Sequence, residues 1–449
     1  MLTHLKSILA HVLPGDPRIK DVDRFVELHD QGLERVLSIV DGTASYDQLI
    51  AEQINSKYKT ALPDTMALTE KRQTAIQLAQ RKLARPPRRL LVAAYSGFVC
   101  DGKTKNNLRE FDHFDRLCAT LNPTLGTQNY TVNPKQTRAP RPDTSERALV
   151  ARISTRTAEF YQSRENISAG VVNQQIAYSM HFISFLRALC VKGAVLPKAF
   201  VQANDHWPAR VARSMVMKGL GIPRIYLQHA EVTDAFPPLD FEYSILRNQR
   251  SLETYARIGP VSGQTFVIAR DLPPEGFAQR LMQDRSGPVS VVIYPTARIL
   301  RDRLIALLKV LSSNAMISNV VVKRHPRALP LTLDDPELAD VKIVDDVTTQ
   351  DHIAIVGNSS VALELLASGV PVYQNFEFDP IRADYYGFVN AGLTKTAPMD
   401  QMHGHFWPRY EIDEAWRLEF QKWIPGREES EQNLERLLSE LTKLTPLPR

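Results

Sequence analysis

The sequence contains no long apolar run. No stretch approaches the roughly eighteen residues that a membrane-spanning helix needs. Its first residues, MLTHLKSILAHVLPGD, also lack the cleavage pattern of a secretory signal peptide. We therefore predict a cytoplasmic protein whose contact with the inner membrane, if it makes one, is peripheral.

Cysteines and metal-binding patterns are also scarce. Only three cysteines occur in 449 residues, at Cys100, Cys118 and Cys190. Their number and wide spacing exclude a disulfide framework and a structural zinc site, so we expect buried thiols. The only Asp-x-Asp motif, Asp21–Asp23, opens a predicted helix, where capping explains it, and His403–His405 has no carboxylate cluster beside it. The sequence predicts metal-independent chemistry without a bound cofactor.

Charge of one sign does not dominate the chain. The 55 Lys and Arg residues and 50 Asp and Glu residues leave a formal net charge of +5. Zinc-finger spacing, RNA-binding aromatic signatures and long basic helices are absent, so we predict no nucleic-acid partner. Positive charge gathers in two clusters, Arg81–Arg89 and Lys135–Arg141. Each fits acidic lipid headgroups, a polyanionic acceptor or an ordinary solvated face.

Length and composition indicate a globular protein with more than one domain. Hydrophobic residues make up 43% of the chain and charged residues 23%, which is enough for a sizeable core. A chain of 449 residues suits two ordinary domains with extra helices. Residues 1–87 read as an N-terminal helical extension that packs on the main body or in an oligomer. Its helices are predicted over Val22–Ile39, Tyr46–Tyr58 and Leu68–Leu83.

Short β-branched runs alternate with helical patterns in the rest of the chain. Strands are predicted at Leu90–Tyr95, Ala199–Ala203, Arg224–Gln228, Ser290–Tyr294, Ser318–Val322, Val341–Val344 and Ile353–Val356. This alternation favours parallel sheets with right-handed crossovers. We therefore predict an α/β fold with two Rossmann-like domains, residues 88–285 on the acceptor side and 286–410 on the nucleotide-donor side. Residues 411–449 are predicted to form C-terminal helices that pack back on the first domain.

Two connecting segments carry separate predictions. Residues 122–148 are rich in Pro, Thr, Asn and Arg, and we interpret them as a long loop that covers the acceptor. Asp284–Pro288 reads as the hinge between the two α/β domains.

Two short motifs follow strands in the second domain, Lys323–Arg327 and Gly357–Ser360. Ligands of doubly wound domains bind outside the carboxyl ends of the strands, where both motifs would lie. The second motif opens a helical pattern, and a helix start with hydroxyls and free backbone N–H groups binds phosphate. The alternatives are that Ser359 or Ser360 is only a helix cap and that His325 is only a turn residue.

Four candidate bases follow two strands of the first domain: Asp205, His206, His229 and Glu231. Transfer to a hydroxyl needs a general base, and histidine or a carboxylate can supply it. Asp205 can instead be a helix cap, and His206 can be a turn residue.

His325-Pro326 together with Ser359-Ser360 resembles the paired motifs of bacterial polysialyltransferases and capsule-type transferases, and of CDP-glycerol glycerophosphotransferases. The resemblance implies the GT-B architecture and a cytidine-nucleotide donor. It implies that His325, Ser359 and Ser360 hold the donor phosphate and that Glu364 reaches the ribose. Further donor-side candidates are Arg324, Pro326, Asn358 and Thr296.

The segment Tyr226–Ala230 is similar to the strand-histidine-loop segment of CDP-glycerol glycerophosphotransferases, where the histidine is the proposed base. This likeness implies His229 as the base, although Ala230 stands where that family usually has glycine. In the polysialyltransferase-like branch the base is a carboxylate of the N-terminal domain, which keeps Asp205 and Glu231 as alternatives.

The resemblance implies a metal-independent glycosyltransferase of bacterial surface-polysaccharide synthesis. We expect it to transfer an acidic sugar, of the sialic acid or Kdo type, from a CMP-linked donor to an acceptor glycan that can be lipid-linked. The alternatives are a CDP-glycerol-type polyol-phosphate transferase, a nucleotide-sugar 2-epimerase, and a non-catalytic glycan-binding module.

Overall fold

The computed structural model describes residues 21–41 and 89–444, together with positions 73, 77 and 81. Within the second range it leaves out residues 93–94, 96, 103, 120–126, 130–134, 139–143, 163–168, 191–193, 206, 235, 297–298, 326–335 and 405. The predicted helices over Tyr46–Tyr58 and Leu68–Leu83 lie outside the described residues. Among the described residues, no helix combines the length and apolar character that crossing a membrane requires.

Six parallel strands form the first sheet, in the order β3-β2-β5-β6-β7-β8. The strands are β2 (Phe98–Asp101), β3 (Thr127–Asn129), β5 (Ala199–Gln202), β6 (Arg224–Leu227), β7 (Asp240–Leu246) and β8 (Ser262–Val267). Successive side chains of a strand point to opposite faces, so each buried strand feeds two cores. Val99 and Phe200 enter one core, whereas Phe98 and Val201 enter the other.

The second sheet also has six parallel strands, in the order β11-β10-β9-β12-β13-β14. The strands are β9 (Val289–Tyr294), β10 (Ile317–Lys323), β11 (Lys342–Val344), β12 (Ile353–Val356), β13 (Val372–Gln374) and β14 (Lys395–Thr396). Numbered along the chain, this is the strand order 3-2-1-4-5-6 of dinucleotide-binding domains. The strand order reverses between β9 and β12, which makes that point the expected ligand crevice.

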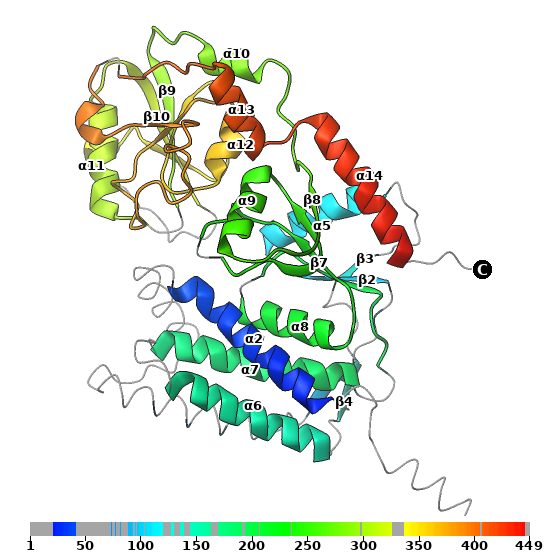
Figure 1. Ribbon diagram of the computed structural model, residues 1–449. Coiled ribbons are helices and arrows are strands. Elements are labelled where there is room, and N and C mark those ends of the chain that lie inside the picture. Colours follow the sequence, from blue (N-terminus) through cyan, green and yellow to red (C-terminus); the bar gives the residue numbers. More distant parts are fainter. Residues whose placement is uncertain are drawn as a thin grey trace, which may run out of the picture.

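One face of the first sheet is covered by a helical layer. It contains α2 (Val22–Asp41), α6 (Thr144–Gln162), α7 (Ala169–Cys190) and α8 (Pro208–Gly219), with α2 packed against the other three (Figure 1). Phe25 and Val36 of α2 are buried there with Tyr178 and Phe182 of α7. The helix predicted over Val22–Ile39 is therefore present as α2, and it packs on the first domain.

The opposite face of the first sheet carries α5 (Lys105–Cys118) and the last helix, α14 (Arg427–Leu444). Leu437 and Leu441 of α14 are completely buried against this face, and the helix contacts β8. The chain therefore returns to the first domain after it has built the second. A third small core lies beneath α9 (Gln249–Ile258), around Tyr226, Phe241 and Tyr255.

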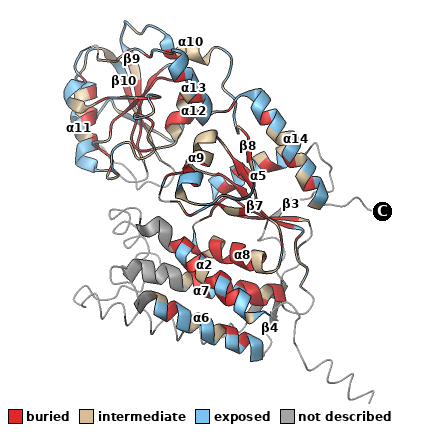
Figure 2. Cartoon of the chain, in the orientation of Figure 1, coloured by how far each residue is buried: buried red, intermediate tan, exposed pale blue. Residues whose placement is uncertain are grey.

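The second domain is built around a single core, with most strand residues buried (Figure 2). Its helices are α10 (Phe277–Met282), α11 (Arg301–Ser312), α12 (Val361–Ala367) and α13 (Glu414–Trp423), with short 3-10 turns η3 (Pro336–Leu338) and η4 (Met399–Gln401). Four leucines of α11 face this core, as do Trp416 and Phe420 of α13. The predicted strands of this domain are confirmed to within one or two residues at their ends.

The start of the first parallel sheet differs from the prediction. The run at Leu90–Tyr95 forms β1 (Arg89–Val92), which pairs antiparallel with β4 (Lys135–Arg138) in a separate two-stranded sheet. The first strand of the parallel sheet is β2, which was not among the predicted strands. Both runs are apolar, so local pattern did not distinguish the one that pairs with β5. The segment 122–148, interpreted as a long loop up to its last few positions, contains β3 and β4, and α6 begins at Thr144.

The crossing between domains also differs from the predicted hinge. Phe277 of α10 stacks on Phe420 of α13, and Leu281 lies in the core of the second domain. Arg280 of α10 donates a hydrogen bond to the carbonyl of Ser368 at 3.1 Å. Because α10 already belongs to the second domain, Asp284–Pro288 lies inside that domain and the chain crosses between β8 and α10.

Candidate functional site

The donor-side loop follows β12 at the point where the strand order of the second sheet reverses. Gly357 is held against Asp379, because a Cβ atom at Gly357 would lie 2.7 Å from the Asp379 Oδ2 atom. The same carboxylate oxygen accepts the backbone N–H of Asn358 at 2.7 Å. The Asn358 Oδ1 atom in turn accepts the backbone N–H of Tyr385 at 2.8 Å. Asn358 is thus buried and its side chain braces this loop against the following one.

Ser359 and Ser360 lie where the sequence predicts them, at the start of α12. Ser360 is the N-cap residue, but its side chain makes no capping hydrogen bond. The Ser359 hydroxyl accepts the backbone N–H of Val361 at a long 3.4 Å. Both side chains are half-buried. Helix capping therefore does not account for the two hydroxyl groups at this position. Both remain candidates for binding a ligand.

The other donor-side candidates follow neighbouring strands of the same sheet. Thr296 follows β9, and the half-buried His325 follows β10. The Arg324 backbone N–H bonds to the carbonyl of Val344 at 2.8 Å, and its exposed side chain lies 3.3 Å from Asp345. Pro326 lies outside the described residues. Thr296 and Ser359 flank the strand-order reversal, and His325 lies one strand further along.

Glu364 of α12 contacts the first domain. Its Oε1 atom lies 3.1 Å from Nη2 of Arg270 and 3.7 Å from Nη1 of Arg109. Arg270 follows β8, and Arg109 lies on α5. Glu364 follows the carboxyl end of β12, whereas Arg270 follows the carboxyl end of β8. The strand ends of both sheets thus face one interdomain site, as expected for a ligand held between two α/β domains.

A buried carboxylate, Glu110 of α5, organises the first domain's side of this site. Arg247 and Arg270 both donate to its Oε1 atom, Arg270 at 3.3 Å, and Arg109 Nε lies 3.6 Å away. The side chain of Glu110 is 4% exposed. Three guanidinium groups therefore share one buried carboxylate. This arrangement leaves a net positive charge on the side of the first domain that faces the second.

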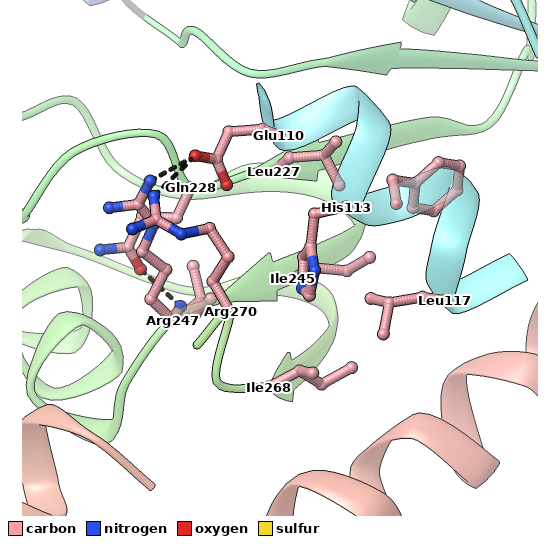
Figure 3. A pocket seen from close by; sticks show the side chains of 11 residues that line it. Glu110, His113, Leu117, Leu227, Gln228, Ile245, Arg247, Ile268 and Arg270 are labelled. Carbon is pink, nitrogen blue, oxygen red and sulfur yellow. Dashed lines mark hydrogen bonds and ion pairs between the residues drawn. The ribbon is translucent and has the colours of Figure 1, made fainter. Parts of the chain in front are cut away.

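A small pocket lies beside these arginines, between α5 and the ends of β6, β7 and β8 (Figure 3). Its polar wall contains Glu110, His113, Gln228, Arg247 and Arg270, and its other lining residues are apolar. Burial is the main cause that lowers the pKa of His113, so its ring is neutral near pH 7. Within the described part of the chain, His113 Nε2 and Arg247 Nε are buried without a hydrogen-bond partner.

None of the predicted bases that the structure describes, Asp205, His229 and Glu231, lines this pocket. Asp205 is completely buried and accepts a hydrogen bond from the Tyr255 hydroxyl at 2.9 Å, and its backbone carbonyl accepts one from Arg35 of α2. These hydrogen bonds tie Asp205 to α2 and α9, and its role as a base stays a prediction. His206 lies outside the described residues.

The two bases predicted after β6 lie nearer the interdomain site. His229 is half-buried, and its carbonyl accepts a hydrogen bond at 3.2 Å from Arg247, which lines the pocket. Glu231 is buried and accepts a hydrogen bond from Asn248 Nδ2 at 2.8 Å. Burial raises the pKa of Glu231, and the charge of Glu364 in the other domain adds to this rise. Both residues remain proposals as the base.

Sequence reasoning missed Arg109, Glu110, Arg247 and Arg270. Arg247 and Arg270 follow the ends of β7 and β8, and Arg109 and Glu110 lie on the helix after β2, but none of these three strands was among the predicted ones. Once those three strands are placed, the parallel arrangement brings their carboxyl ends to one edge. Among the described residues, no group of three or more His, Cys, Asp or Glu side chains is placed to hold a metal ion.

Further contacts join the two domains. Arg250 of α9 donates to Glu419 of α13 at 2.8 Å, and the hydroxyls of Thr233 and Tyr385 lie 3.0 Å apart. Two Rossmann-like domains thus meet at their strand ends, and a C-terminal helix crosses back to the first. This is the GT-B architecture.

No family model matches the chain, and no curated protein matches its sequence. Solved structures similar to this GT-B chain include the calicheamicin glycosyltransferase CalG4, 11% identical, which covers 79% of this chain and 100% of its own with a TM-score of 0.42. UGT89C1 of Arabidopsis thaliana is 11% identical, with coverages of 77% and 99% and a TM-score of 0.40. MurG of Acinetobacter baumannii is 12% identical, with coverages of 78% and 100% and a TM-score of 0.35. Values this low assign no activity, donor or acceptor to this chain.

Proposed function

We propose that this protein is a nucleotide-sugar-dependent glycosyltransferase whose reaction takes place between its two domains. One observation carries the proposal: Oε1 of Glu364 lies 3.1 Å from Nη2 of Arg270. Glu364 follows a strand of the second sheet, and Arg270 follows a strand of the first. Segments that follow strands of both sheets thus converge on one site with charged groups and a pocket beside it. Such convergence suits a reaction that joins a donor on one domain to an acceptor on the other.

The donor that we propose is a CMP-linked acidic sugar of the sialic acid or Kdo type, used in bacterial surface-polysaccharide synthesis. The support is the resemblance carried by His325-Pro326 and Ser359-Ser360, together with the strand order of the second sheet. Ser359 and Ser360 would bind the phosphate with their hydroxyls, and His325 would approach it from β10. Glu364 would bind the ribose.

The reaction needs a base on the acceptor side. His229 would take the proton from an acceptor hydroxyl while that oxygen bonds to the anomeric carbon of the sugar. The bond from that carbon to the phosphate oxygen breaks, and the electron pair leaves with CMP. Arg324 and the backbone N–H groups near Ser359 would stabilise the charge on the leaving phosphate. Glu231 is the alternative base, since its raised pKa suits proton transfer nearer neutral pH.

Nucleotide binding gives the first test. We expect CMP to raise the midpoint of thermal unfolding more than CDP or UDP does at equal concentration, because a ligand that binds only the native state stabilises it. A stronger effect of CDP would favour a CDP-glycerol-type polyol-phosphate transferase. A preference for UDP would contradict the CMP assignment.

Turnover gives the second test. With a CMP-linked acidic sugar, we expect release of CMP to depend on an acceptor glycan, and His229→Ala to lower that release by about 100-fold or more. Asp205→Asn serves as the comparison, since its loss should act through stability instead. Release of free nucleotide without any acceptor would favour a 2-epimerase acting on a UDP-sugar. Tight nucleotide binding without turnover of any donor would favour a non-catalytic module.

A further inference from the structure

Arg270 and Arg109 of the first domain hold a carboxylate that comes from the second. The Glu364 Oε1 atom lies 3.1 Å from Arg270 Nη2 and 3.7 Å from Arg109 Nη1. We propose that these two arginines recognise the carboxylate of the transferred acidic sugar, and that Glu364 takes the place of that carboxylate when no donor is bound. The inference rests on the proposed function, because it assigns the charged group of the donor.

The charges around the arginines make such an exchange neutral. Arg109, Arg247 and Arg270 carry three positive charges, and Glu110 is the one buried carboxylate that they share in the first domain. Asp271, whose side chain is 70% exposed, pairs with Arg270 from the solvent side. Glu364 adds a further negative charge from across the interface. A sugar carboxylate that displaced Glu364 would carry the same negative charge, so the positive charge of the arginines would stay paired when the donor binds.

The geometry fits a carboxylate rather than a neutral hydroxyl. Arg270 is 9% exposed and is held by Glu110 at 3.3 Å and Asp271 at 2.5 Å, so its guanidinium group is fixed in place. A fixed, planar guanidinium group binds carboxylates through paired N–H donors.

Donors remain available for a ligand at this site. Arg109 lies at ion-pair distance from two carboxylates but makes no side-chain hydrogen bond to the described residues. His113 Nε2 and Arg247 Nε are buried and lack a partner within the same described part, and both side chains line the adjoining pocket (Figure 3). Buried polar atoms normally have a partner, so the Arg247 N–H donor and the His113 ring nitrogen, whose role depends on the tautomer, point to a polar group that binds beside Arg270.

The experiment compares two ligands that differ by the acidic sugar. Calorimetry would measure the affinity of the full chain for CMP and for CMP-sialic acid, with CMP-Kdo as a second acidic donor. Arg270→Ala should weaken binding of the preferred acidic donor by at least about 10-fold, the range expected for a charged hydrogen bond, and change CMP affinity by no more than about 2-fold. Arg109→Ala should act in the same direction with a smaller effect, because Arg109 is 44% exposed.

A matched control separates recognition from domain closure. Arg250→Ala removes the ion pair to Glu419, which also joins the two domains but does not line the pocket. This variant should keep the wild-type ratio of the two affinities. Glu364→Gln, which withdraws the competing charge but keeps an amide for the ribose, should strengthen binding of the acidic donor relative to CMP. Thermal unfolding of each variant would confirm that it is folded.

The outcomes distinguish this inference from the proposed function. If the wild type binds neither CMP nor an acidic donor, the proposed function is wrong and the inference fails with it. If the wild type binds the acidic donor but Arg270→Ala weakens CMP and the donor equally, the inference alone is wrong. An equal loss in Arg250→Ala would also overturn it, because domain closure would then explain the effect.

Discussion

At the scale of single residues, Asp240 links stability to pH. It accepts hydrogen bonds from Lys218 Nζ at 2.9 and 3.0 Å and lies 3.3 Å from Arg224, which is completely buried. Burial by itself would raise the pKa of Asp240, but the charge of Arg224 and the hydrogen bond from Lys218 outweigh it and lower the pKa from 3.8 to about 2. The charged carboxylate therefore stabilises the folded state above pH 3.8, and this contribution is lost as the pH falls through about 2.

Asp240→Asn tests this dependence. We expect the variant to be less stable than the wild type, and the gap between their unfolding free energies to be about 2 kcal/mol larger at neutral pH than at about pH 2. One pKa unit corresponds to about 1.4 kcal/mol. Urea unfolding of both proteins across this range would measure the gap. A gap that stays the same at every pH would contradict the expectation.

The pKa of Glu231 is shifted in the opposite direction, so its effect on stability changes with pH in the opposite sense. Burial raises its pKa, so the folded state binds the proton more tightly than the unfolded chain does. The cost of burying the charge is absent below the usual pKa of 4.5 and grows as the pH rises from there through the folded-state pKa. We expect Glu231→Gln to be more stable than the wild type at neutral pH, with the difference disappearing near pH 4. Since Gln can still accept the hydrogen bond from Asn248, greater stability of the variant at both pH values would indicate another cause.

At the scale of elements, one glycine allows α2 to pack closely on α7. A Cβ atom at Gly32 would lie 2.0 Å from the hydroxyl oxygen of Tyr178, which is completely buried and donates a hydrogen bond to the carbonyl of His29 at 3.0 Å. We expect Gly32→Ala to lower the unfolding free energy by about 1–3 kcal/mol through overpacking. Chemical denaturation would measure it. Gly287→Ala is the matched control, since nothing lies within 4 Å of that position, and an equal loss there would refute the packing explanation.

At the scale of the whole molecule, α14 couples the two domains. It follows the second domain in the chain but buries Leu437 and Leu441 against the first. Leu437→Ala should lower the unfolding free energy by about 2–5 kcal/mol, because it leaves a cavity beneath the returning helix. Calorimetry should show the first domain unfolding at a lower temperature than the second. Leu418→Ala in α13, where the leucine is 53% exposed, should leave the unfolding profile nearly unchanged.

Some parts of the fold are encoded locally in the sequence and others are not. The four strands predicted in the second domain and the pattern of α14 were found from periodicity alone, because alternation and helical spacing record which side chains are buried. Leu90–Tyr95 was placed in the wrong sheet, since an apolar run does not specify its partner strand. The edge strand β8 was missed because Ser262 to Gln264 are exposed and give no alternation.

The sequence by itself determined four strands of the second domain, the helix at Val22–Ile39, and the positions of His325, Ser359 and Ser360 after strand ends, because these depend on residues close together in the chain. Only the tertiary structure decided that Glu364 meets Arg270 and that Asp205 is buried. An ion pair depends on which side chains the docking of two domains brings together. Charge alone does not select a partner from among the many opposite charges in the chain, so the interdomain site exists only once both sheets are folded and in contact.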